Sequence, residues 1–476
     1  MLIIRNADFL LTLDPNRRVI TNGSIIIKDG LIAEVGKQDV LEQKYSDSLS
    51  NAEAIDGTNT LVSPGFINTH VHTLEHLSRG LIPDNLPTRP WVLNYFFPFQ
   101  AALSEDEAYL SAKLACLDMV RCGTTCFIDS SILNSNAYVD CVIQAVDDLG
   151  LRAVLGRGFC DRMPADLPSY FREEWRTSLF GKSAAAAVGE AEEILKKWTV
   201  RSGGRIRAWA TIFGLFTLCS DELFRTIKKL ADKYGVGTNF HMASSIEEAQ
   251  ELEKRAGVWP ITQLHRLEAL GPNVLLTHVI AIKDEEINLL AKHDVKVAHC
   301  PGAALKLAKG ASRIGKIPEM LKSGVTVSLG ADGVCSCGTF DPTRLMFVAA
   351  GLFKDARMDA TMIPAETALE MATINGARSL LWDKEIGSIE VGKKADLVQF
   401  DLRRPEWVPT HDVVRNLVYS ADGGSIKTVI VDGRVVVRDR KAVLIDEGRL
   451  VDQAREVGEQ IARRTKLKAE SKWPRV

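Results

Sequence analysis

Between residues 61 and 384, short apolar runs alternate with longer segments of helical spacing, and this unit recurs about eight times. Such an alternation is typical of a parallel sheet with helices packed against it, and eight units predict a closed (β/α)8 barrel of the TIM type, an α/β fold. The predicted strands end near His70, Asp129, Gly158, Phe213, His241, His278, His299 and Asp332. The predicted helices span 103–121, 136–149, 184–198, 220–234, 283–293 and 339–353.

The two ends of the chain carry a different pattern, in which apolar and polar positions alternate in short runs. Asn22-Gly23 and Asp29-Gly30 interrupt these runs near the start, and Asp432-Gly433 interrupts them near the other end. Dipeptides of this kind are typical of two-residue hairpin turns. Both ends therefore predict short antiparallel strands.

These patterns predict three parts of the chain. Residues 1–60 and 385–445 together predict one small discontinuous β-sandwich domain. The barrel is expected at 61–384, between the two halves of that domain. The charged segment 446–476 has helical spacing and predicts a surface helix packed on the barrel.

Charge and hydropathy argue against several classes of partner. The formal net charge of −2 shows no basic excess, so we expect no nucleic-acid partner. The longest apolar run, Leu345–Phe353, is well short of the ~20 residues that cross a bilayer. Arg5 and Asp8 interrupt the first apolar stretch, which argues against a signal peptide. We expect a cytoplasmic protein that does not bind membranes.

The 9 cysteines, an odd number, fit reduced thiols better than a disulfide framework. Cys335 and Cys337 are the one close pair, and without a second pair they are only a weak signal for a zinc site. Structural thiols are the simpler interpretation.

Histidines and an aspartate stand at the ends of several predicted strands. His70 and His72 are two positions apart, so their side chains point to the same side of a strand. His241, His278 and Asp332 end other strands of the barrel. The carboxyl ends of barrel strands converge on one mouth, so these side chains should meet there. Unrelated core or capping roles would require all five to coincide at one rim, and we therefore predict a metal site.

Imidazole and carboxylate ligands suit zinc, iron, manganese or cobalt, and zinc is the default expectation for one divalent ion. Such an ion lowers the pKa of bound water from ~15.7 toward ~7 and so supplies hydroxide at neutral pH. Asp332 could take a proton from that water and pass it to a leaving group. This chemistry predicts a hydrolase.

The other histidines and nearby aromatic residues are weaker candidates. His299 ends the seventh predicted strand and could face the mouth, and His76 could line the substrate entrance, although packing roles are the alternative for both. Trp91, Phe96 and Phe97 could add an aromatic surface, although such residues more often pack in cores. Surface positions are expected for His265, His293 and His411.

Several segments occur in order along nearly the whole chain: Pro64-Gly-Phe-Ile-Asn-Thr-His-Val-His72, His241-Met-Ala, Thr277-His278, Val297-Ala-His-Cys-Pro301, Leu329-Gly-Ala-Asp-Gly333, Met371-Ala-Thr-Ile-Asn-Gly-Ala-Arg378, Gly387-Ser-Ile-Glu-Val-Gly-Lys-Lys-Ala-Asp-Leu397 and Val431-Asp-Gly-Arg-Val435. In these segments the chain resembles the amidohydrolase superfamily, and within it the branch of atrazine chlorohydrolase, S-adenosylhomocysteine deaminase and guanine deaminase. The resemblance implies that His70, His72, His241 and Asp332 are metal ligands and that His278 orients the attacking water or the substrate. It also implies the flanking β-domain and a homo-oligomer.

One departure from the family pattern concerns proton supply. The deaminases and the chlorohydrolase of this branch carry a glutamate three residues after the fifth-strand histidine, where this chain has Ser244. A serine hydroxyl can donate a hydrogen bond but cannot serve as a carboxylic acid. Three explanations stay open: Glu247 or Glu248 reaches in instead, the substrate needs no ring protonation, or activity is weak or lost.

Two other departures concern the substrate pocket. Gln100 stands where the S-adenosylhomocysteine deaminases carry a ribose-binding glutamate, which makes a nucleoside substrate less favoured. Ala303-Ala304 replaces the Ser-Asn of the family and makes that wall less polar.

The leading hypothesis is hydrolysis of a C–N bond in a small, rather apolar or heteroaromatic substrate, of the amide, urea or carbamate type or a ring amino group. The rivals are hydrolytic dechlorination of a triazine-like ring, deamination of a nucleobase or nucleoside, and a catalytically silent scaffold, which would predict lost metal ligands.

Overall fold

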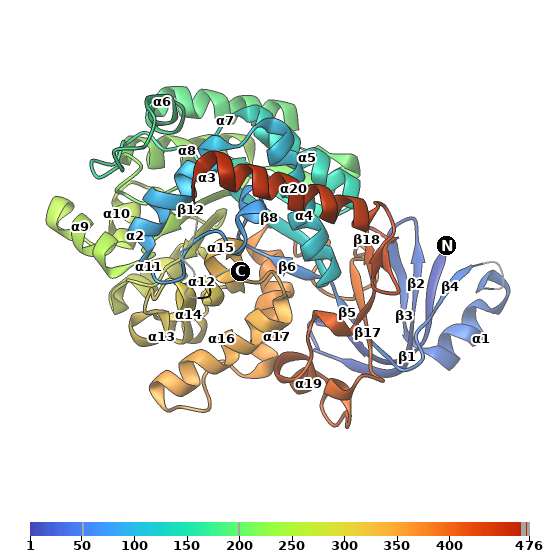
Figure 1. The fold of residues 1–476 in the computed structure, drawn as a ribbon. Coiled ribbons are helices and arrows are strands. Elements are labelled where there is room, and N and C mark those ends of the chain that lie inside the picture. Colours follow the sequence, from blue (N-terminus) through green and yellow to red (C-terminus); the bar gives the residue numbers. More distant parts are fainter. Residues whose placement is uncertain (50–51, 199, 468–472, 474–476) are drawn as a thin grey trace.

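The strands of the two chain ends form one mixed sheet in a computed structural model that describes residues 1–49, 52–198, 200–467 and 473 (Figure 1). The sheet has nine strands in the order β20-β19-β18-β17-β5-β1-β2-β3, with β4 paired to β1. β5 pairs parallel with β1 and antiparallel with β17. The pairing of β5 with β17 joins the two ends of the chain. The strands are β1 (Leu2–Leu11), β2 (Val19–Lys28), β3 (Leu31–Lys37), β4 (Glu53–Asp56), β5 (Thr60–Pro64), β17 (Leu397–Asp401), β18 (Ile426–Val431), β19 (Arg434–Arg438) and β20 (Lys441–Ala442).

One of the expected hairpin turns is wrong. Asn22-Gly23 lies inside β2, opposite a shift in register between Ile4 and Ala7 of β1. Asn22 has a φ of 51°, so the dipeptide does adopt the left-handed backbone that a turn would need. It forms an irregularity within the strand instead. Turns do join β2 to β3 at Asp29-Gly30 and β18 to β19 at Asp432-Gly433.

The segment between these ends contains two sheets whose strands pair in parallel, apart from β10, which pairs antiparallel with β11. The first has the order β10-β11-β9-β8-β6 and the second β12-β13-β14-β15, while β7 and β16 pair separately. Backbone hydrogen bonds link the two sheets at both margins, from Thr69 to Leu329 and from His241 to Phe213. The strands are β6 (Phe66–Asn68), β7 (Val71–His72), β8 (Thr124–Ile132), β9 (Arg152–Arg157), β10 (Val200–Arg201), β11 (Ile206–Ala208), β12 (Thr238–Met242), β13 (Val274–His278), β14 (Lys296–His299), β15 (Val327–Leu329) and β16 (Asp332–Gly333).

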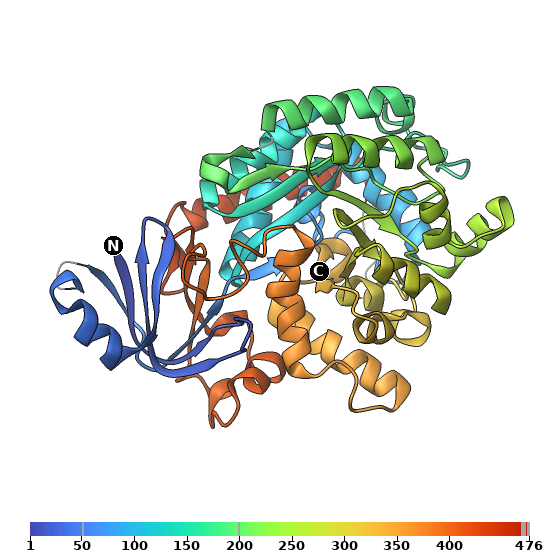
Figure 2. The same ribbon diagram turned by 180° about the vertical axis from the view of Figure 1, so that it is seen from behind.

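Helices cover the parallel strands on the outside, and Figure 2 shows the same layering from behind. All six predicted helices are present, with shifts of a few residues at their ends. The longer ones are α4 (Glu105–Arg121), α5 (Asn136–Leu149), α6 (Glu173–Phe180), α7 (Ala184–Trp198), α8 (Asp221–Tyr234), α9 (Ile246–Ala256), α11 (Asp284–Lys292), α16 (Pro342–Arg357), α17 (Ala365–Ala372) and α20 (Glu447–Thr465). The shorter ones are α2 (Thr88–Trp91), α3 (Phe97–Ala102), α10 (Pro260–Arg266), α12 (Pro301–Lys306), α13 (Ala311–Ile314), α14 (Ile317–Lys322), α15 (Val334–Cys337), α18 (Ile374–Ser379) and α19 (Val413–Tyr419), and α1 (Gln38–Leu49) lies beside the nine-stranded sheet.

Local sequence explains where several helices begin. Ser104 caps α4 and exchanges reciprocal hydrogen bonds with Glu107, which satisfies two of the free amides at the helix start. Asp341 caps α16 and Pro342 occupies its first position, so this helix starts later than the expected residue 339. The fourth parallel strand ends at Ala208, earlier than the expected Phe213, because the following residues cross toward β12.

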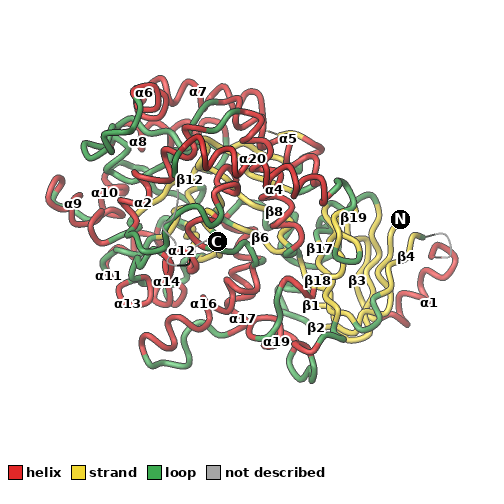
Figure 3. The backbone as a smooth tube through the Cα atoms, in the orientation of Figure 1, coloured by secondary structure: helices red, strands yellow, loops and turns green. Residues whose placement is uncertain are grey.

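The C-terminal helix α20 runs across α4 on the surface (Figures 1 and 3). Arg464 near its end pairs with Glu107 of α4 at 2.7 Å. The helix ends at Thr465, and residues 468–472 and 474–476 lie outside the described part of the chain. Within the described ranges the cysteines are all free, and none of the helices is both long and apolar enough to cross a bilayer.

A buried arginine connects the parallel strands to the nine-stranded sheet. Arg152 in β9 donates to Asp396 at 2.7 Å and to Asp432 at 2.9 Å. The side chains of Arg152 and Asp396 are only 1% and 2% exposed. The guanidinium also lies 5.6 Å from the ring of Trp382, and the two parts of the molecule therefore share one buried ionic contact.

Candidate metal centre

Five buried side chains converge where the parallel strands end. His70 follows β6, His72 lies in β7, and Asp332 lies in the adjacent β16. His241 lies in β12 and His278 ends β13. The sequence predicted this convergence from strand ends alone. We refer to the set as the five-residue centre: His70, His72, His241, His278 and Asp332.

The nitrogen and oxygen atoms of the centre are close enough to share one ion. The Nε2 atoms of His70 and His72 are 3.0 Å apart. Asp332 places Oδ1 3.0 Å from Nε2 of His72 and Oδ2 3.8 Å from Nε2 of His278. One possible donor atom from each of His70, His241 and His278 lies within 4.8 Å of the others, and the same holds for His70, His72 and Asp332.

Neighbouring groups fix which nitrogen of the His241 and His70 rings faces the centre. His241 places Nδ1 2.6 Å from the carbonyl oxygen of Phe213, which leaves Nε2 for the centre. The Phe213 ring stacks on the same imidazole with centroids 4.5 Å apart. Nδ1 of His70 lies 3.3 Å from the Thr277 hydroxyl. Phe96 packs edge-on against His72 at 5.3 Å and adds an apolar wall.

Burial keeps three of the imidazoles neutral. It lowers the pKa of His241 to about 3, and the positive charge of His72 acts in the same direction. It also holds the pKa values of His70 and His278 well below their usual range. A neutral imidazole has a free lone pair, which is the form that binds metals.

The carboxylates have the opposite effect on His72. Burial works against the charged form, but Glu75 and Asp332 raise the pKa of His72 to about 10. Burial likewise works against the charged form of Asp332, yet the hydrogen bond from His72 and the charges of His72 and Lys309 hold its pKa well below the usual range. The centre therefore combines imidazole ligands with an ionised carboxylate, a donor set that fits one divalent ion such as zinc, iron, manganese or cobalt.

Two residues of the centre have left-handed backbone conformations. His278 has a φ of 78° and Asp332 a φ of 72°. Such conformations cost non-glycine residues of the order of 1–3 kcal/mol each and persist only where the surroundings impose them. At Asp332 the backbone amide donates to the carbonyl of His70 at 2.8 Å, which ties the two candidate ligands together.

Glu75 supports His72 from the side away from Asp332. Its Oε1 lies 3.0 Å from Nδ1 of His72, and the Cys335 thiol donates to its Oε2 at 2.6 Å. A carboxylate on the far nitrogen of a metal-binding imidazole orients the ring and raises its basicity. The sequence contains no pattern that singled out Glu75 or Cys335 for this position.

Replacing Glu75 with glutamine should therefore weaken metal binding by ~10–100-fold, because the ring of His72 loses its charged partner. Competition with a chelator of known affinity measures the effect in the folded protein. An unchanged metal affinity would contradict this role of Glu75.

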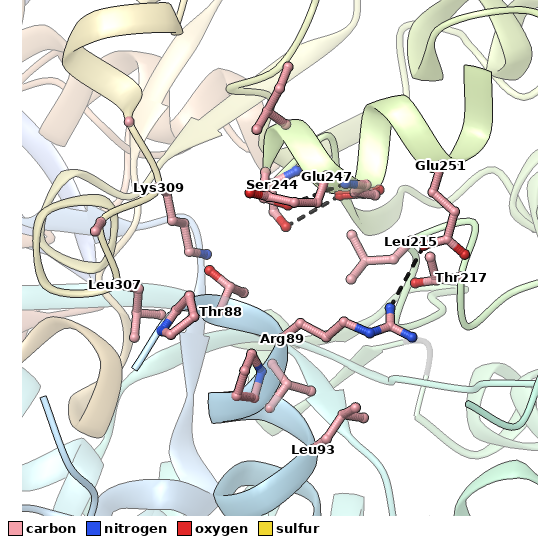
Figure 4. A pocket seen from close by; sticks show the side chains of 18 of the residues that line it. Thr88, Arg89, Leu93, Leu215, Thr217, Ser244, Glu247, Glu251, Leu307 and Lys309 are labelled. Carbon is pink, nitrogen blue, oxygen red and sulfur yellow. Dashed lines mark hydrogen bonds and ion pairs between the residues drawn. The ribbon is translucent and has the colours of Figure 1, made fainter. Parts of the chain in front are cut away.

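A cavity of about 380 Å³ lies beside the centre (Figure 4). Its walls are mostly apolar, and they are formed by α2, the start of α9, and the loops that carry Leu215 and Lys309. The five-residue centre does not itself line this cavity. Lys309 connects the two, because its Nζ lies 3.2 Å from Nε2 of His278 while its side chain lines the cavity.

Ser244 and Glu248 form one wall of the cavity. The Ser244 amide donates to Oε2 of Glu248 at 2.8 Å, and the hydroxyl donates to the same oxygen at 3.3 Å. The Ala243 amide donates to Oε1 at 3.3 Å. Burial raises the pKa of Glu248 to about 7, although these hydrogen bonds and the charge of Lys309 oppose the shift. An acidic group with a pKa near neutrality therefore stands behind Ser244.

The raised pKa of Glu248 makes stability depend on pH. A carboxyl with a higher pKa in the folded than in the unfolded state stabilises the fold below its ordinary pKa of 4.5 and loses that contribution as the pH rises through about 7. Relative to Glu248→Gln, the wild-type protein should lose up to about 3 kcal/mol of unfolding free energy between acidic and mildly alkaline pH. Denaturant titrations across this range measure it, with Glu247→Gln on the exposed side of α9 as the control. Parallel pH profiles for the wild type and Glu248→Gln would contradict the assignment.

The other expected substrate-binding residues are buried but do not line the cavity. Gln100 uses its amide on the backbone of Ser131 and Leu133. His76 lies 3.2 Å from Asp118 and packs against the ring of Phe340. These contacts are structural, and a direct substrate role for Gln100 or His76 stays a prediction.

Trp91 and His299 have similarly internal positions. Trp91 stacks on Phe96 with centroids 5.8 Å apart, and Phe96 in turn packs against His72. His299 packs against Phe353 at 5.9 Å. Their substrate roles also stay predictions, whereas Ser244 does line the cavity.

Comparison with known proteins matches residues 61–436 to the profile of the amidohydrolase family. The 5'-deoxyadenosine deaminase of Methanosarcina acetivorans is 33% identical over 97% of this chain and 99% of that protein. The 5-methylthioadenosine/S-adenosylhomocysteine deaminase of Thermodesulfovibrio yellowstonii is 33% identical over 95% of this chain and 97% of that protein.

Solved structures show the same fold. An adenosine deaminase from Xanthomonas campestris with bound zinc has a TM-score of 0.84 and 27% identity, covering 97% of this chain and 98% of that one. An atrazine chlorohydrolase from Arthrobacter aurescens complexed with zinc has a TM-score of 0.86 and 24% identity, covering 96% of this chain and 100% of that one.

Proposed function

The chain belongs to the amidohydrolase family, and on this premise we propose that it hydrolyses a C–N bond of a small molecule at the five-residue centre. The observation that carries the proposal is the buried cluster of four imidazoles and one ionised carboxylate at the ends of parallel strands. We assign His70, His72, His241 and Asp332 as ligands of one divalent ion. Zinc is the preferred ion, in line with the zinc-bound relative from Xanthomonas campestris.

A divalent ion at this centre would act as a Lewis acid: it would lower the pKa of a bound water and make the substrate carbon more electrophilic. The chain's own groups handle the protons and the orientation. Asp332 is held ionised, so it can accept a proton from the attacking water and return it to the leaving nitrogen. Neutral His278, next to Asp332, orients the water or the substrate. Ser244 lines the substrate cavity and donates a hydrogen bond to Glu248.

The mostly apolar walls of the cavity favour a small apolar or heteroaromatic substrate. The bond is of the amide, urea or carbamate type, or joins an amino group to a ring. Deamination of an adenosine derivative is the second candidate, because relatives with 33% identity over nearly the full chain carry that name. Dechlorination rests only on a shared fold, and a silent scaffold is disfavoured because all five residues of the centre are present.

We further propose that the two parallel sheets are parts of one closed (β/α)8 barrel at 61–384, because hydrogen bonds join them at both margins. We propose likewise that residues 1–60 and 385–445 form the accompanying β-sandwich domain and that the segment 446–476, as far as it is described, is the tail packed on the barrel. The homo-oligomer and the cytoplasmic location expected from the sequence stay predictions.

The proposal is tested on purified protein whose metal content has been measured. A panel of amides, ureas, carbamates, aminated heterocycles, adenosine derivatives and chlorotriazines is incubated with the metal-loaded enzyme, and products are identified by mass spectrometry. We expect release of ammonia or an amine with uptake of one water. Release of chloride alone, or no turnover by fully loaded enzyme across the C–N compounds, would overturn the proposal.

A further inference from the structure

Lys309 is a buried lysine between the five-residue centre and the cavity. Burial lowers the pKa of its ammonium group, and the charge of Asp332 opposes that shift. Lys309 follows α12 in a short loop, and its backbone amide donates to the carbonyl of Ala304, which fixes the loop. The side chain is only 3% exposed. In Figure 4 its ammonium group points into the cavity, toward the side on which Ser244 lies.

The ammonium group has fewer protein partners than donors. It has three N–H donors, and among the described residues one hydrogen-bond contact is found, to Nε2 of His278 at 3.2 Å. The nearest carboxylate oxygen, Oδ2 of Asp332, is 3.9 Å away, beyond hydrogen-bond range. Buried N–H donors without acceptors are costly, so a ligand that supplies acceptor oxygens would stabilise this arrangement.

The other cation of the cavity and the buried Glu248 have protein partners. Arg89 donates to both oxygens of Asp166, at 2.6 and 2.7 Å. The Glu248 carboxylate accepts hydrogen bonds from the amides of Ala243 and Ser244. Lys309 is therefore the cation of this cavity that is left to meet a negatively charged ligand.

The position of Lys309 determines where a negatively charged group of the ligand would lie. Its Nζ is within 4 Å of both His278 and Asp332, so a group bound to it lies next to the bond that reacts. The apolar residues of the other walls, which include Leu93, Leu215 and Ile314, suit an apolar body. We propose that Lys309 determines specificity by binding a carboxylate of the substrate, so that the substrate is a small apolar C–N compound with a carboxylate beside the scissile bond. This inference rests on the proposed function and specifies its substrate class.

Binding of simple probes tests Lys309 without knowledge of the substrate. Calorimetric titrations of the zinc-loaded protein use benzoate and benzamide, which are alike in size and differ in charge. We expect Lys309→Met to bind benzoate at least ~10-fold more weakly than the wild type, with benzamide unchanged. Lys309→Arg keeps the charge and should retain most of the benzoate affinity. The exposed Lys322→Met serves as the matched control and should behave as the wild type.

Equal benzoate affinity in Lys309→Met and wild type would overturn the proposal, because the carboxylate would then be held by the metal alone. Equal affinity of the wild type for benzoate and benzamide would overturn it as well. If Lys309→Met is not recovered folded with its zinc, Lys309→Gln removes the charge with a smaller change in polarity and gives the same comparison.

Turnover separates this inference from the proposed function. The matched pair is 2-acetamidobenzoate and N-(2-methylphenyl)acetamide, which share the scissile amide and differ in the carboxylate. We expect the wild type to favour the carboxylate in kcat/KM by at least ~10-fold, and Lys309→Met to lose that preference. A preference for the neutral amide would overturn the role of Lys309 while leaving C–N hydrolysis established. If no C–N compound is hydrolysed, the proposed function fails, and the benzoate titration still decides whether Lys309 binds carboxylates.

Discussion

Asp332→Asn should lower kcat by at least ~10²–10⁴-fold, because an amide can neither accept the proton of the attacking water nor contribute a negative charge to the metal site. The structure makes this residue the ionised member of the centre, at 3.0 Å from His72 and 3.8 Å from His278. The same substitution should reduce the amount of divalent metal that the protein binds. His241→Ala should do likewise, because it removes an imidazole whose Phe213 contact aims Nε2 at the centre.

Two measurements on each variant separate metal loss from the loss of proton transfer. Elemental analysis gives the metal content, and turnover of one C–N substrate at saturating metal gives kcat. Asp452→Asn on the exposed face of α20 is the control for a simple change of charge. An Asp332→Asn protein that is folded, free of metal and fully active would refute the role of the five-residue centre.

Arg152→Met should destabilise the protein by about 3–5 kcal/mol, because it leaves Asp396 buried and without its charged partner. The effect should be large because both side chains are almost fully enclosed and the guanidinium donates to two carboxylates. It should also loosen the nine-stranded sheet from the parallel strands, since Asp396 directly precedes β17, Asp432 directly follows β18, and Arg152 lies in β9.

Arg207→Met is the matched control for this prediction. Arg207 lies over the same Trp382 ring at 4.0 Å, but its ionic partner Glu385 is 42% exposed. Exposed ion pairs contribute roughly 0–1 kcal/mol, so the control should shift the denaturation midpoint far less. Similar losses in both variants would show that the aromatic contact, rather than the buried ion pair, stabilises this junction.

The sequence was sufficient to predict the centre because its residues follow strand ends, and strand ends are local features. His70, His241 and Asp332 stand after apolar runs whose parallel arrangement brings their ends together. Lys309 and Glu75 could not be found in this way. Their roles depend on which side chains face them across the fold, and neither residue stands in a recognisable pattern.

Local sequence patterns also failed to predict structure where contacts with distant residues determine the conformation or the role of a side chain. Asn22-Gly23 takes the backbone conformation that its sequence favours, but pairing with β1 turns it into an irregularity within β2. Gln100 stands at a position that the family resemblance linked to substrate, yet its amide is engaged with the backbone of Ser131 and Leu133. Both cases needed the tertiary partners to be known.

The pairing of β5 with β17 has a consequence for synthesis of the chain. β5 ends at Pro64, and its antiparallel partner begins at Leu397, so the edge of β5 stays unpaired until most of the polypeptide has been made. At ~5–20 residues per second the wait is on the order of half a minute. During that interval β5 presents an open, apolar strand edge, where pairing with another nascent chain competes with folding. Pairing of β17 with β5 ends this exposure.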